Sequence, residues 1–177
     1  FHEHTILFPP RQYGRFFPVV KGKETWYTDS MKKRCLLICL LLLLTGGEPL
    51  TYPGFRELYR ELRKMGFVIS INSNATLIDE ETVRWLAEDP PQRINITLYG
   101  ASDETYLRLC NHATGHTVVT RAIEMLQAAN IPVKLNCSVT PDNVCDLEKI
   151  IAYSDERTLV LQATSYMLPP LRRDETR

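Results

Sequence analysis

The sequence lacks an excess of charge of either sign. Lysine plus arginine and aspartate plus glutamate both number 21, so the formal net charge is zero. No basic stripe follows a periodic segment, as contact with a phosphate backbone would require. Internal repeats and low-complexity tracts are also lacking, and a hydrophobic content of 44% is ordinary for a globular protein. We therefore expect a folded domain without a nucleic-acid partner.

No apolar run is long enough to cross a membrane. Residues 35–44 form an apolar run of ten after the segment 31–34, Met-Lys-Lys-Arg, whereas a spanning helix needs about 20. This pattern imitates a signal peptide, but it is internal and no small-x-small cleavage site follows. A buried strand explains the run better, so we expect a cytoplasmic protein without a membrane partner. Export that uses residues 31–44 as a signal is the alternative.

The sequence lacks an even set of cysteines that could all pair in disulfides. The five cysteines are scattered, which argues against a secreted disulfide framework and favours a reducing compartment. We expect Cys110, Cys137 and Cys145 to be buried and to behave as small hydrophobic residues. The sequence also lacks a spaced set of histidines and carboxylates for a metal cage, and a Ser–His–Asp set for hydrolysis.

From residue 40 onward, apolar strands alternate with amphipathic helices. The expected strands are 40–45, 67–71, 94–98, 133–139 and 159–163. The expected helices are 55–65, 79–88, a short one capped by Ser102, 118–129 and 144–153. This alternation indicates βαβ units and a parallel sheet. Because a complete eight-unit barrel takes about 250 residues, the sequence predicts an α/β fold with a partial (β/α) barrel.

Three segments follow from this reading. Residues 1–34 are rich in proline and aromatic residues without a period, so they are expected to be irregular. Residues 35–166 are expected to form the partial barrel, with a first βα unit that is incomplete or atypical. Residues 167–177 have the composition of a linker to a further domain.

The strand at 40–45 ends in Gly46, Gly47, Glu48 and Pro49. Paired glycines let the backbone turn sharply and approach a ligand, because no Cβ intervenes. The proline fixes its own φ and favours an extended Glu48. Parallel α/β folds bind ligands at the carboxyl ends of their strands, so we expect a ligand at this turn. An ordinary strand–turn–helix junction is the alternative.

Polar residues follow the other strands as well. The strand ends expected to converge are 45–48, 72–74, 97–100, 136–138 and 162–166. Amides, hydroxyls and carbonyls dominate these ends, which favours binding of a small zwitterion or nucleoside over hydrolysis. Lys134 and Arg172 are candidates for contacts to an anion, whereas His112 and His116 are expected to be loop residues.

The Gly46–Pro49 turn after an apolar strand resembles the S-adenosylmethionine-binding motif of the radical S-adenosylmethionine (radical SAM) superfamily. The segment 73–75, Ser-Asn-Ala, is similar to the Thr-Asn-Gly of that family's third strand. The segment 97–100, Thr-Leu-Tyr-Gly, is similar to the Ser-Leu-Asp-Gly of its fourth strand. The resemblance covers residues 40 to about 170 and rests on these three motifs, which occur along the chain in the same order as in the family.

The resemblance implies how the cofactor would be held. Backbone groups of Gly46, Gly47 and Glu48 would bind the amino group of the methionine moiety, and Pro49 would shape the turn. Polar groups near Asn74, Thr97 and Ser138 would reach the carboxylate or the ribose. Gln162 would lie near the adenine. No residue is assigned a catalytic role.

The resemblance also implies a reaction. A 4Fe–4S cluster would cleave S-adenosylmethionine reductively, and the 5′-deoxyadenosyl radical would abstract hydrogen from a peptide or small-molecule substrate. Such an oxidoreductase or maturase takes its electron from a donor such as a flavodoxin or ferredoxin.

The cluster motif of the family, C-x3-C-x2-C, is incomplete in this sequence. Cys35 and Cys39 match its first two positions, and Leu42 stands at the third. Three interpretations are open. The true cluster loop is missing from the sequence, or the chain is a truncated or spliced form of an active enzyme. Alternatively, the chain is a degenerate barrel that lacks the cluster and at most binds S-adenosylmethionine or a nucleoside.

Overall fold

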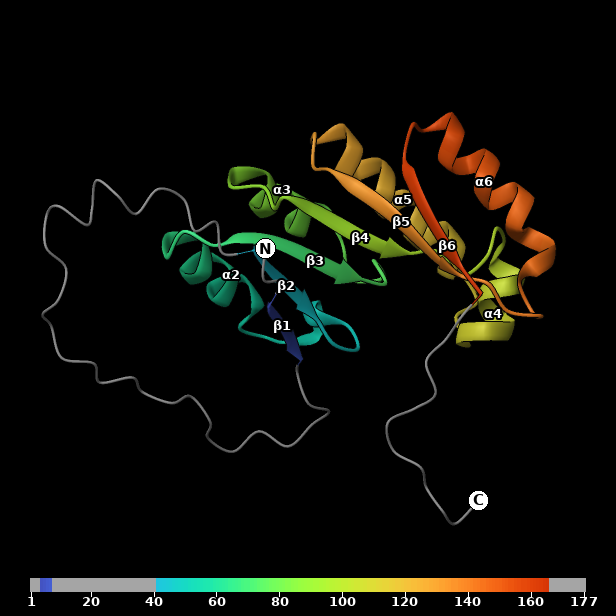
Figure 1. Cartoon of the computed structure of the whole chain (residues 1–177), viewed down its shortest axis with the longest axis horizontal. Helices are drawn as coiled ribbons and strands as arrows, with labels where there is room; N and C mark the ends of the chain where they lie inside the picture. Colours follow the sequence, from blue (N-terminus) through green and yellow to red (C-terminus); the bar gives the residue numbers. More distant parts are fainter. Residues whose placement is uncertain (1–3, 8–40, 166–177) are drawn as a thin grey trace, which may run out of the picture.

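A computed structural model describes residues 4–7 and 41–165, which form one parallel sheet flanked by helices (Figure 1). Its strands lie in the order β1-β2-β3-β4-β5-β6, and every neighbouring pair is parallel. The strands are β1 His4–Leu7, β2 Leu41–Thr45, β3 Val68–Ser73, β4 Arg93–Thr97, β5 Val133–Ser138 and β6 Val160–Thr164.

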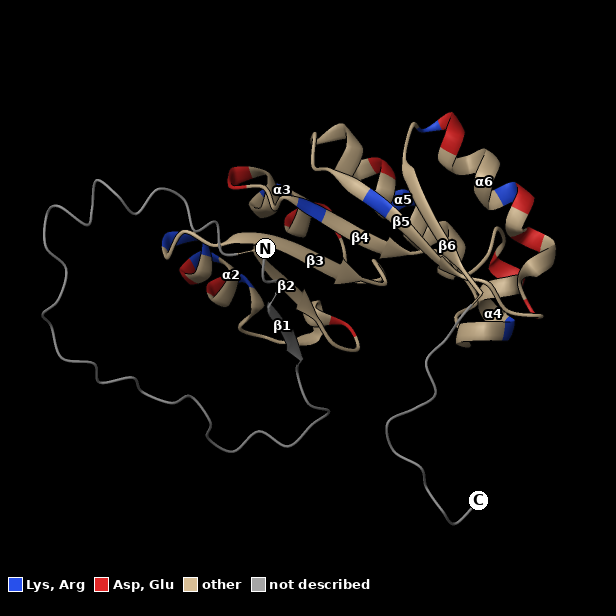
Figure 2. Cartoon of the chain, viewed as in Figure 1, with Lys and Arg blue, Asp and Glu red and all other residues tan. Residues whose placement is uncertain are grey.

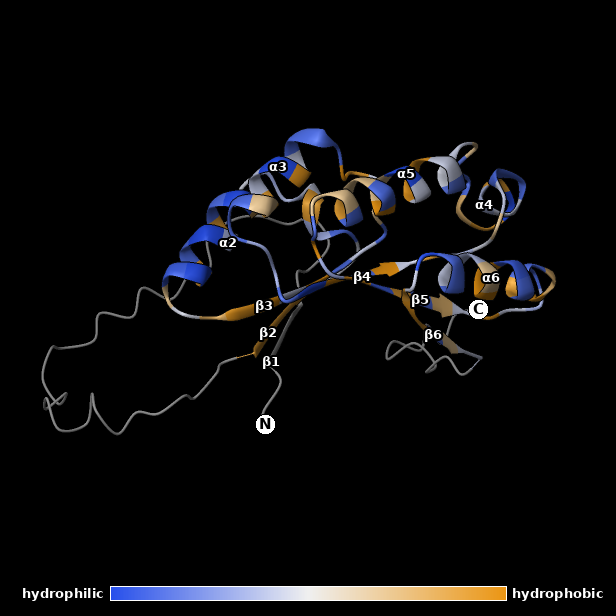
Figure 3. Cartoon of the chain, turned by 90° about the horizontal axis from the view of Figure 1, so that it is seen from above, coloured by the Kyte–Doolittle hydropathy of each residue, from blue (hydrophilic) through white to orange (hydrophobic). Residues whose placement is uncertain are grey.

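The connections between strands carry the helices. The α-helices are α2 Phe55–Lys64, α3 Glu80–Glu88, α4 Asp103–Cys110, α5 Gly115–Ala128 and α6 Leu147–Glu156, with 3-10 turns η1 Pro49–Thr51 and η2 Val144–Asp146. The labelled helices all lie on one side of the curved sheet (Figure 3). Sequential strand order with helices on one face is the winding of a barrel, because a doubly wound sheet reverses its order and places helices on both faces. The predicted α/β fold with a partial barrel is confirmed.

The N-terminal prediction needs one correction. His4–Leu7 were assigned to an irregular segment, 1–34, but they form β1 and pair with β2, His4 opposite Leu42 and Leu7 opposite Thr45. Four residues are too few to show a periodic pattern, and only pairing with β2 makes them a strand. The rest of 1–34, the segment 35–40 and the expected linker at 167–177 lie outside the described residues.

Strand β2 is fully buried on one face only, although its sequence predicts burial on both faces. An unbroken apolar run predicts burial on both faces, yet only Leu42 and Leu44 are buried. Leu41, Leu43 and Thr45 alternate with them and are half-buried. The helices cover one face of the sheet, and the other is the concave face of a half-barrel.

The core lies between the sheet and the helices. Ile71 of β3 and Ile96 of β4 are buried beneath the helix layer. Phe55 and Tyr59 of α2 contact the ring of Trp85 in α3 edge to face, with centroids 6.3 and 5.5 Å apart. The hydroxyl of this tyrosine donates to the carbonyl of residue 89 at 2.7 Å. Aromatic contacts of this kind join α2 and α3 into one layer.

Local signals fixed most helix ends. Asp79 and Ser102 cap α3 and α4, their side chains accepting from backbone N–H groups three residues later. Gly66 follows α2 with φ of 88°, a conformation that favours glycine. Helix α5 begins at Gly115, three residues before the expected start, because its first turn carries too few apolar residues to be recognised.

Two cysteine predictions were wrong. Cys137 is buried in β5, but Cys110 at the end of α4 and Cys145 in η2 are exposed. Both exposed thiols lie in connecting structure, whereas the buried one faces the helix layer from a strand. Among residues 4–7 and 41–165, no helix has the length and apolar character that crossing a bilayer requires.

Candidate functional site

The turn after β2 is open at its glycines. Gly46 has φ of 122°, which side-chain-bearing residues rarely adopt. Gly47 is exposed, and a Cβ added there would meet no atom within 4 Å. Glu48 is extended, with φ of −132° and ψ of 111°, as a residue before proline should be. Pro49 is buried and begins η1.

The carboxylate of Glu48 ties this turn to the end of β3. It accepts hydrogen bonds from the Ser73 hydroxyl at 3.0 Å and from the backbone N–H of Asn74 at 2.7 Å. It also accepts from the N–H of Leu50 at 3.2 Å, within its own turn. The Glu48 carbonyl accepts from Thr51. Since these groups are engaged inside the protein, the peptides of the two glycines are the accessible part of the turn.

Burial raises the pKa of Glu48 above its ordinary value, although hydrogen bonds from Asn74, Leu50 and Ser73 act in the opposite direction. Three donors aimed at one carboxylate match its ionised form. This residue therefore acts as a clamp between two strand ends.

The end of β3 is itself folded tightly. The Asn74 side chain accepts from the backbone N–H and the hydroxyl of Thr76, at 2.9 and 2.7 Å. Ala75 donates its N–H to the Ser73 hydroxyl and has φ of 62°. It stands where the similar Thr-Asn-Gly motif has glycine, and its left-handed backbone gives the physical reason for glycine there.

Ala75→Gly should be almost neutral for stability. Relief of the left-handed strain, about 1 kcal/mol, offsets loss of a buried methyl group, about 0.8 kcal/mol. Ala122→Gly is the matched control, because Ala122 is equally buried but helical, and it should cost about 2 kcal/mol. Urea unfolding measures both. Equal losses in the two variants would show that residue 75 is unstrained.

Asn143 joins the carboxyl ends of β4 and β5. Its amide donates to the carbonyls of Tyr99 and Ser138, both at 2.9 Å, and its side-chain oxygen accepts from the N–H of Thr140 at 2.7 Å. The side chain is 2% exposed. Because it uses donors and acceptor together, it fixes the spacing of two strand ends at the candidate site.

Asp146 clamps the loop that follows β4. Its carboxylate accepts from the Thr105 hydroxyl at 2.6 Å and from the N–H of Ala101 at 3.0 Å. Burial by itself raises the pKa of Asp146, but these bonds and the charges of Lys149 and Arg108 hold it below its ordinary value. No sequence motif predicted the roles of Asn143 and Asp146.

A polar hollow of about 400 Å³ occupies the concave face of the sheet. Its lining is mainly amide, hydroxyl and basic: Leu43, Asn72, Arg93, Asn95, Thr97, Lys134, Asn136, Cys137, Ser138, Gln162 and Thr164. Three residues predicted to bind the cofactor, Thr97, Ser138 and Gln162, are therefore brought together. Arg93 and Asn95 were not predicted, although the polar–apolar alternation along β4 could have indicated their face.

Asn74 lines a neighbouring hollow of about 380 Å³ instead. Its other walls are Thr76, Tyr99, Tyr106, Leu109, Cys110 and His112. The structure thus divides the predicted binding residues between the turn with Asn74 and the concave hollow. His112 is half-buried in this second hollow, and Arg172 lies outside the described residues.

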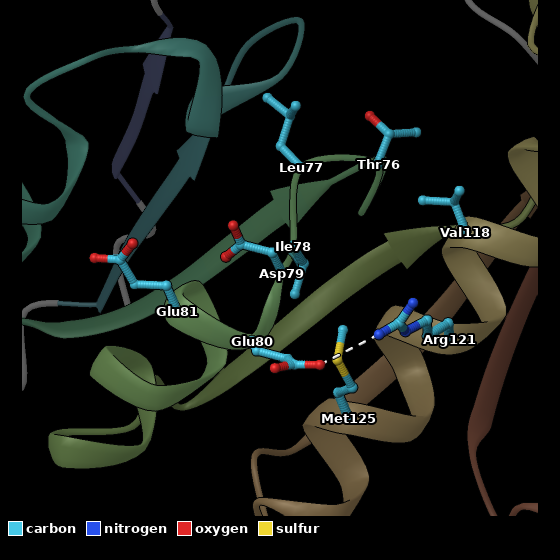
Figure 4. A pocket seen from close by; sticks show the side chains of 9 residues that line it. All are labelled: Thr76, Leu77, Ile78, Asp79, Glu80, Glu81, Val118, Arg121 and Met125. Atoms are coloured by element: carbon cyan, nitrogen blue, oxygen red, sulfur yellow. Dashed lines mark hydrogen bonds and ion pairs between the residues drawn. The ribbon is translucent and has the colours of Figure 1, made fainter.

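A third hollow lies on the helix side of the sheet and shares Thr76 with the second (Figure 4). It lies between the segment 76–81 and α5, and the Glu80–Arg121 ion pair of 3.2 Å crosses it. Apart from Thr76, it contains none of the strand-end residues discussed above.

The iron–sulfur ligands cannot be assigned within the described residues. Cys35 and Cys39 lie outside them, and residues 4–7 and 41–165 contain no group of three histidine, cysteine or acidic side chains that could hold a metal ion.

The residues at the carboxyl edge do suit S-adenosylmethionine. The space above Gly47 is one that a Cβ would begin to fill, and the lining residues at the ends of β4, β5 and β6, Thr97, Ser138 and Thr164, carry neutral hydroxyls. A cationic sulfonium and a zwitterionic tail need such groups.

The geometry defines a class of protein: a parallel half-barrel with a glycine turn and a polar hollow at the carboxyl edge. Within that class, the family model of the radical SAM superfamily matches residues 37–153. The chain belongs to the radical SAM superfamily.

Its curated relatives are longer proteins. An AdoMet-dependent heme synthase of Methanosarcina barkeri is 29% identical over 136 residues, covering 77% of this chain and 39% of the relative. A probable GTP 3′,8-cyclase of Saccharolobus islandicus is 32% identical over 152 residues, covering 78% and 48%. The chain thus spans less than half the length of either relative.

Solved structures share the fold. Native anSMEcpe with bound AdoMet and a Cp18Cys peptide has a TM-score of 0.59 at 25% identity, over 71% of this chain and 37% of that chain. SuiB of Streptococcus suis, bound to its precursor peptide SuiA, has a TM-score of 0.60 at 16% identity, over 70% and 28%. At the latter identity the likeness concerns the fold alone.

Proposed function

We propose that this chain is the S-adenosylmethionine-binding part of a radical SAM enzyme. The observation that carries this proposal is the Glu48 clamp, which joins the Gly46–Gly47 turn to the Ser73–Asn74 segment, directly after Asn72 of the polar hollow. The glycine peptides hold the amino group of the cofactor, and Thr97, Ser138 and Gln162 receive its polar remainder. With a 4Fe–4S cluster bound, such an enzyme would cleave S-adenosylmethionine reductively, and the resulting 5′-deoxyadenosyl radical would abstract hydrogen from the substrate.

The chain's own residues bind and orient in this scheme. Glu48 and Asn143 fix the relative positions of the strand ends, so the cofactor meets a preformed site. The substrate is a peptide or a small molecule, a range that the relatives named above illustrate. We also propose a flavodoxin or ferredoxin as electron donor and the cytoplasm as location, where thiols stay reduced.

Gly47→Val should weaken S-adenosylmethionine binding at least about tenfold, because a branched side chain then occupies the space beside the ligand-facing peptides. Stability should change by less than about 1 kcal/mol, since the added atoms meet open space. Isothermal titration calorimetry on the iron-free full chain measures the affinity.

Ala152→Val, at an exposed position on α6, is the control and should bind as the unmodified chain does. Equal affinity of Gly47→Val and the control would remove the turn from the site. Anaerobic iron–sulfur reconstitution, followed by visible absorbance, then separates a cluster-bearing enzyme from a barrel that only binds the cofactor.

A further inference from the structure

The concave face of the sheet carries two basic side chains on neighbouring strands. Arg93 begins β4, and Lys134 is the second residue of β5; both line the polar hollow. Asn95 is the register partner of Lys134, so Arg93 lies two residues along the same face. Strand geometry places the two basic positions about 8 Å apart. Figure 2 shows basic colouring on β4 and β5 side by side.

No acidic side chain balances these charges in the hollow. Its described lining contains no aspartate or glutamate. The concave face is therefore positive even though the whole chain has no net charge.

Basic residues on the helix side behave differently. Arg60, Arg63 and Arg157 pair with carboxylates of neighbouring helices or helix ends. Among the described residues, neither Arg93 nor Lys134 has an acidic partner within 4.0 Å. The Lys134 ammonium instead donates to the side-chain oxygen of Gln162 on β6, which holds it over the sheet. An ordered cation without a counter-charge is what an anion-binding site provides.

Asn95 adds a second requirement for the ligand. It is 7% exposed, and its amide donates to the Asn72 side-chain oxygen at 2.7 Å. Its own carbonyl oxygen is buried and has no hydrogen-bond partner among the described residues. A buried acceptor of this kind costs about 1–3 kcal/mol unless a donor reaches it. Because Asn95 is the register partner of Lys134, that donor would lie close to the anion.

We infer that Arg93, Lys134 and Asn95 form the substrate subsite of the hollow, for an oxyanion that carries a neighbouring O–H or N–H donor. This inference rests on the proposed function, which places hydrogen abstraction beside the same hollow. Lys134 precedes Ser138 by four residues, about 13 Å along the strand, so the subsite lies below the cofactor edge. Carboxylates and phosphates share the required chemistry.

The test is titration of the isotope-labelled full chain, followed by backbone amide NMR shifts. Two pairs of probes separate the sources of the anion: L-malate against succinate, and glycerol 3-phosphate against methyl phosphate. The hydroxyl-bearing member of at least one pair should shift the amides of 93–97 and 134–138. It should also bind several-fold more tightly than its partner, because only it can donate to Asn95. Lys134→Met and Arg93→Met should each weaken binding about tenfold.

Arg84→Met is the matched control, because it removes the same charge from an exposed position on α3 and should retain the affinity. Absence of localised shifts, equal weakening in the control, or equal affinity within both probe pairs would overturn the inference. Displacement of the probe by S-adenosylmethionine would also overturn it, by assigning the cations to the cofactor. S-adenosylmethionine titration of the same sample, read at residues 46–50, tests the proposed function separately. An anion response without a cofactor response would leave the anion site standing and reject the function.

Discussion

Glu48→Ala is expected to lower S-adenosylmethionine affinity at least about a hundredfold and stability by about 2–4 kcal/mol. The substitution leaves the Ser73 hydroxyl and the N–H groups of Asn74 and Leu50 without their common acceptor. The turn then loses the hydrogen bonds between the Glu48 side chain and the end of β3, and the glycine peptides lose their fixed direction. Calorimetric titration gives the affinity, and urea unfolding gives the stability.

Glu156→Ala is the control, because Glu156 is exposed at the end of α6. It should change neither quantity beyond about 0.5 kcal/mol. Glu48→Gln should have an affinity and a stability between those of Glu48→Ala and those of the control. It keeps one acceptor oxygen but turns an amide donor toward groups that also donate. A Glu48→Ala chain that is destabilised yet binds at full affinity would show that the clamp is structural and that the cofactor lies elsewhere.

Asp146→Ala should lower the free energy of unfolding by about 2–4 kcal/mol. It removes the acceptor of two donors, the Thr105 hydroxyl and the Ala101 N–H, in a region where Asp146 is only 5% exposed. Asp142→Ala, at an exposed position four residues earlier, should be nearly neutral. Equal losses in the two variants would mean that the buried hydrogen bonds contribute nothing.

The lowered pKa of Asp146 predicts that the stability of the fold depends on pH. Because the folded pKa of Asp146 lies below its ordinary value of 3.8, its ionised form stabilises the fold. That contribution is complete above the unfolded pKa and is lost as pH falls below 3.8 through the folded pKa. The stability gap between the unmodified chain and Asp146→Asn should therefore narrow on acidification below this value. Urea unfolding at a series of pH values measures it, and a constant gap would contradict the charge-based account.

Particular residues show which features of the fold could be predicted from the sequence. The apolar spacing of Phe55 and Tyr59 predicted α2, and the capping residues Asp79 and Ser102 predicted the starts of α3 and α4. These signals are local, so neighbouring residues suffice to read them. By contrast, β1 is a strand only because β2 pairs with it, and the exposure of Cys110 depends on where α4 ends. Such features involve distant partners that no short pattern contains.

The candidate site divides in the same way. The sequence by itself determined that a glycine turn with Glu48 and Pro49 follows a buried strand, and that polar residues end the later strands. These motifs were sufficient to indicate the family. They can be recognised in the sequence because the backbone conformation of such a turn depends on adjacent residues. Only the tertiary structure decided where the Glu48 carboxylate goes, and that Arg93 and Lys134 share a concave face whose described lining contains no acidic residue. Strand register and sheet curvature create those proximities, and both arise from packing across the whole sheet.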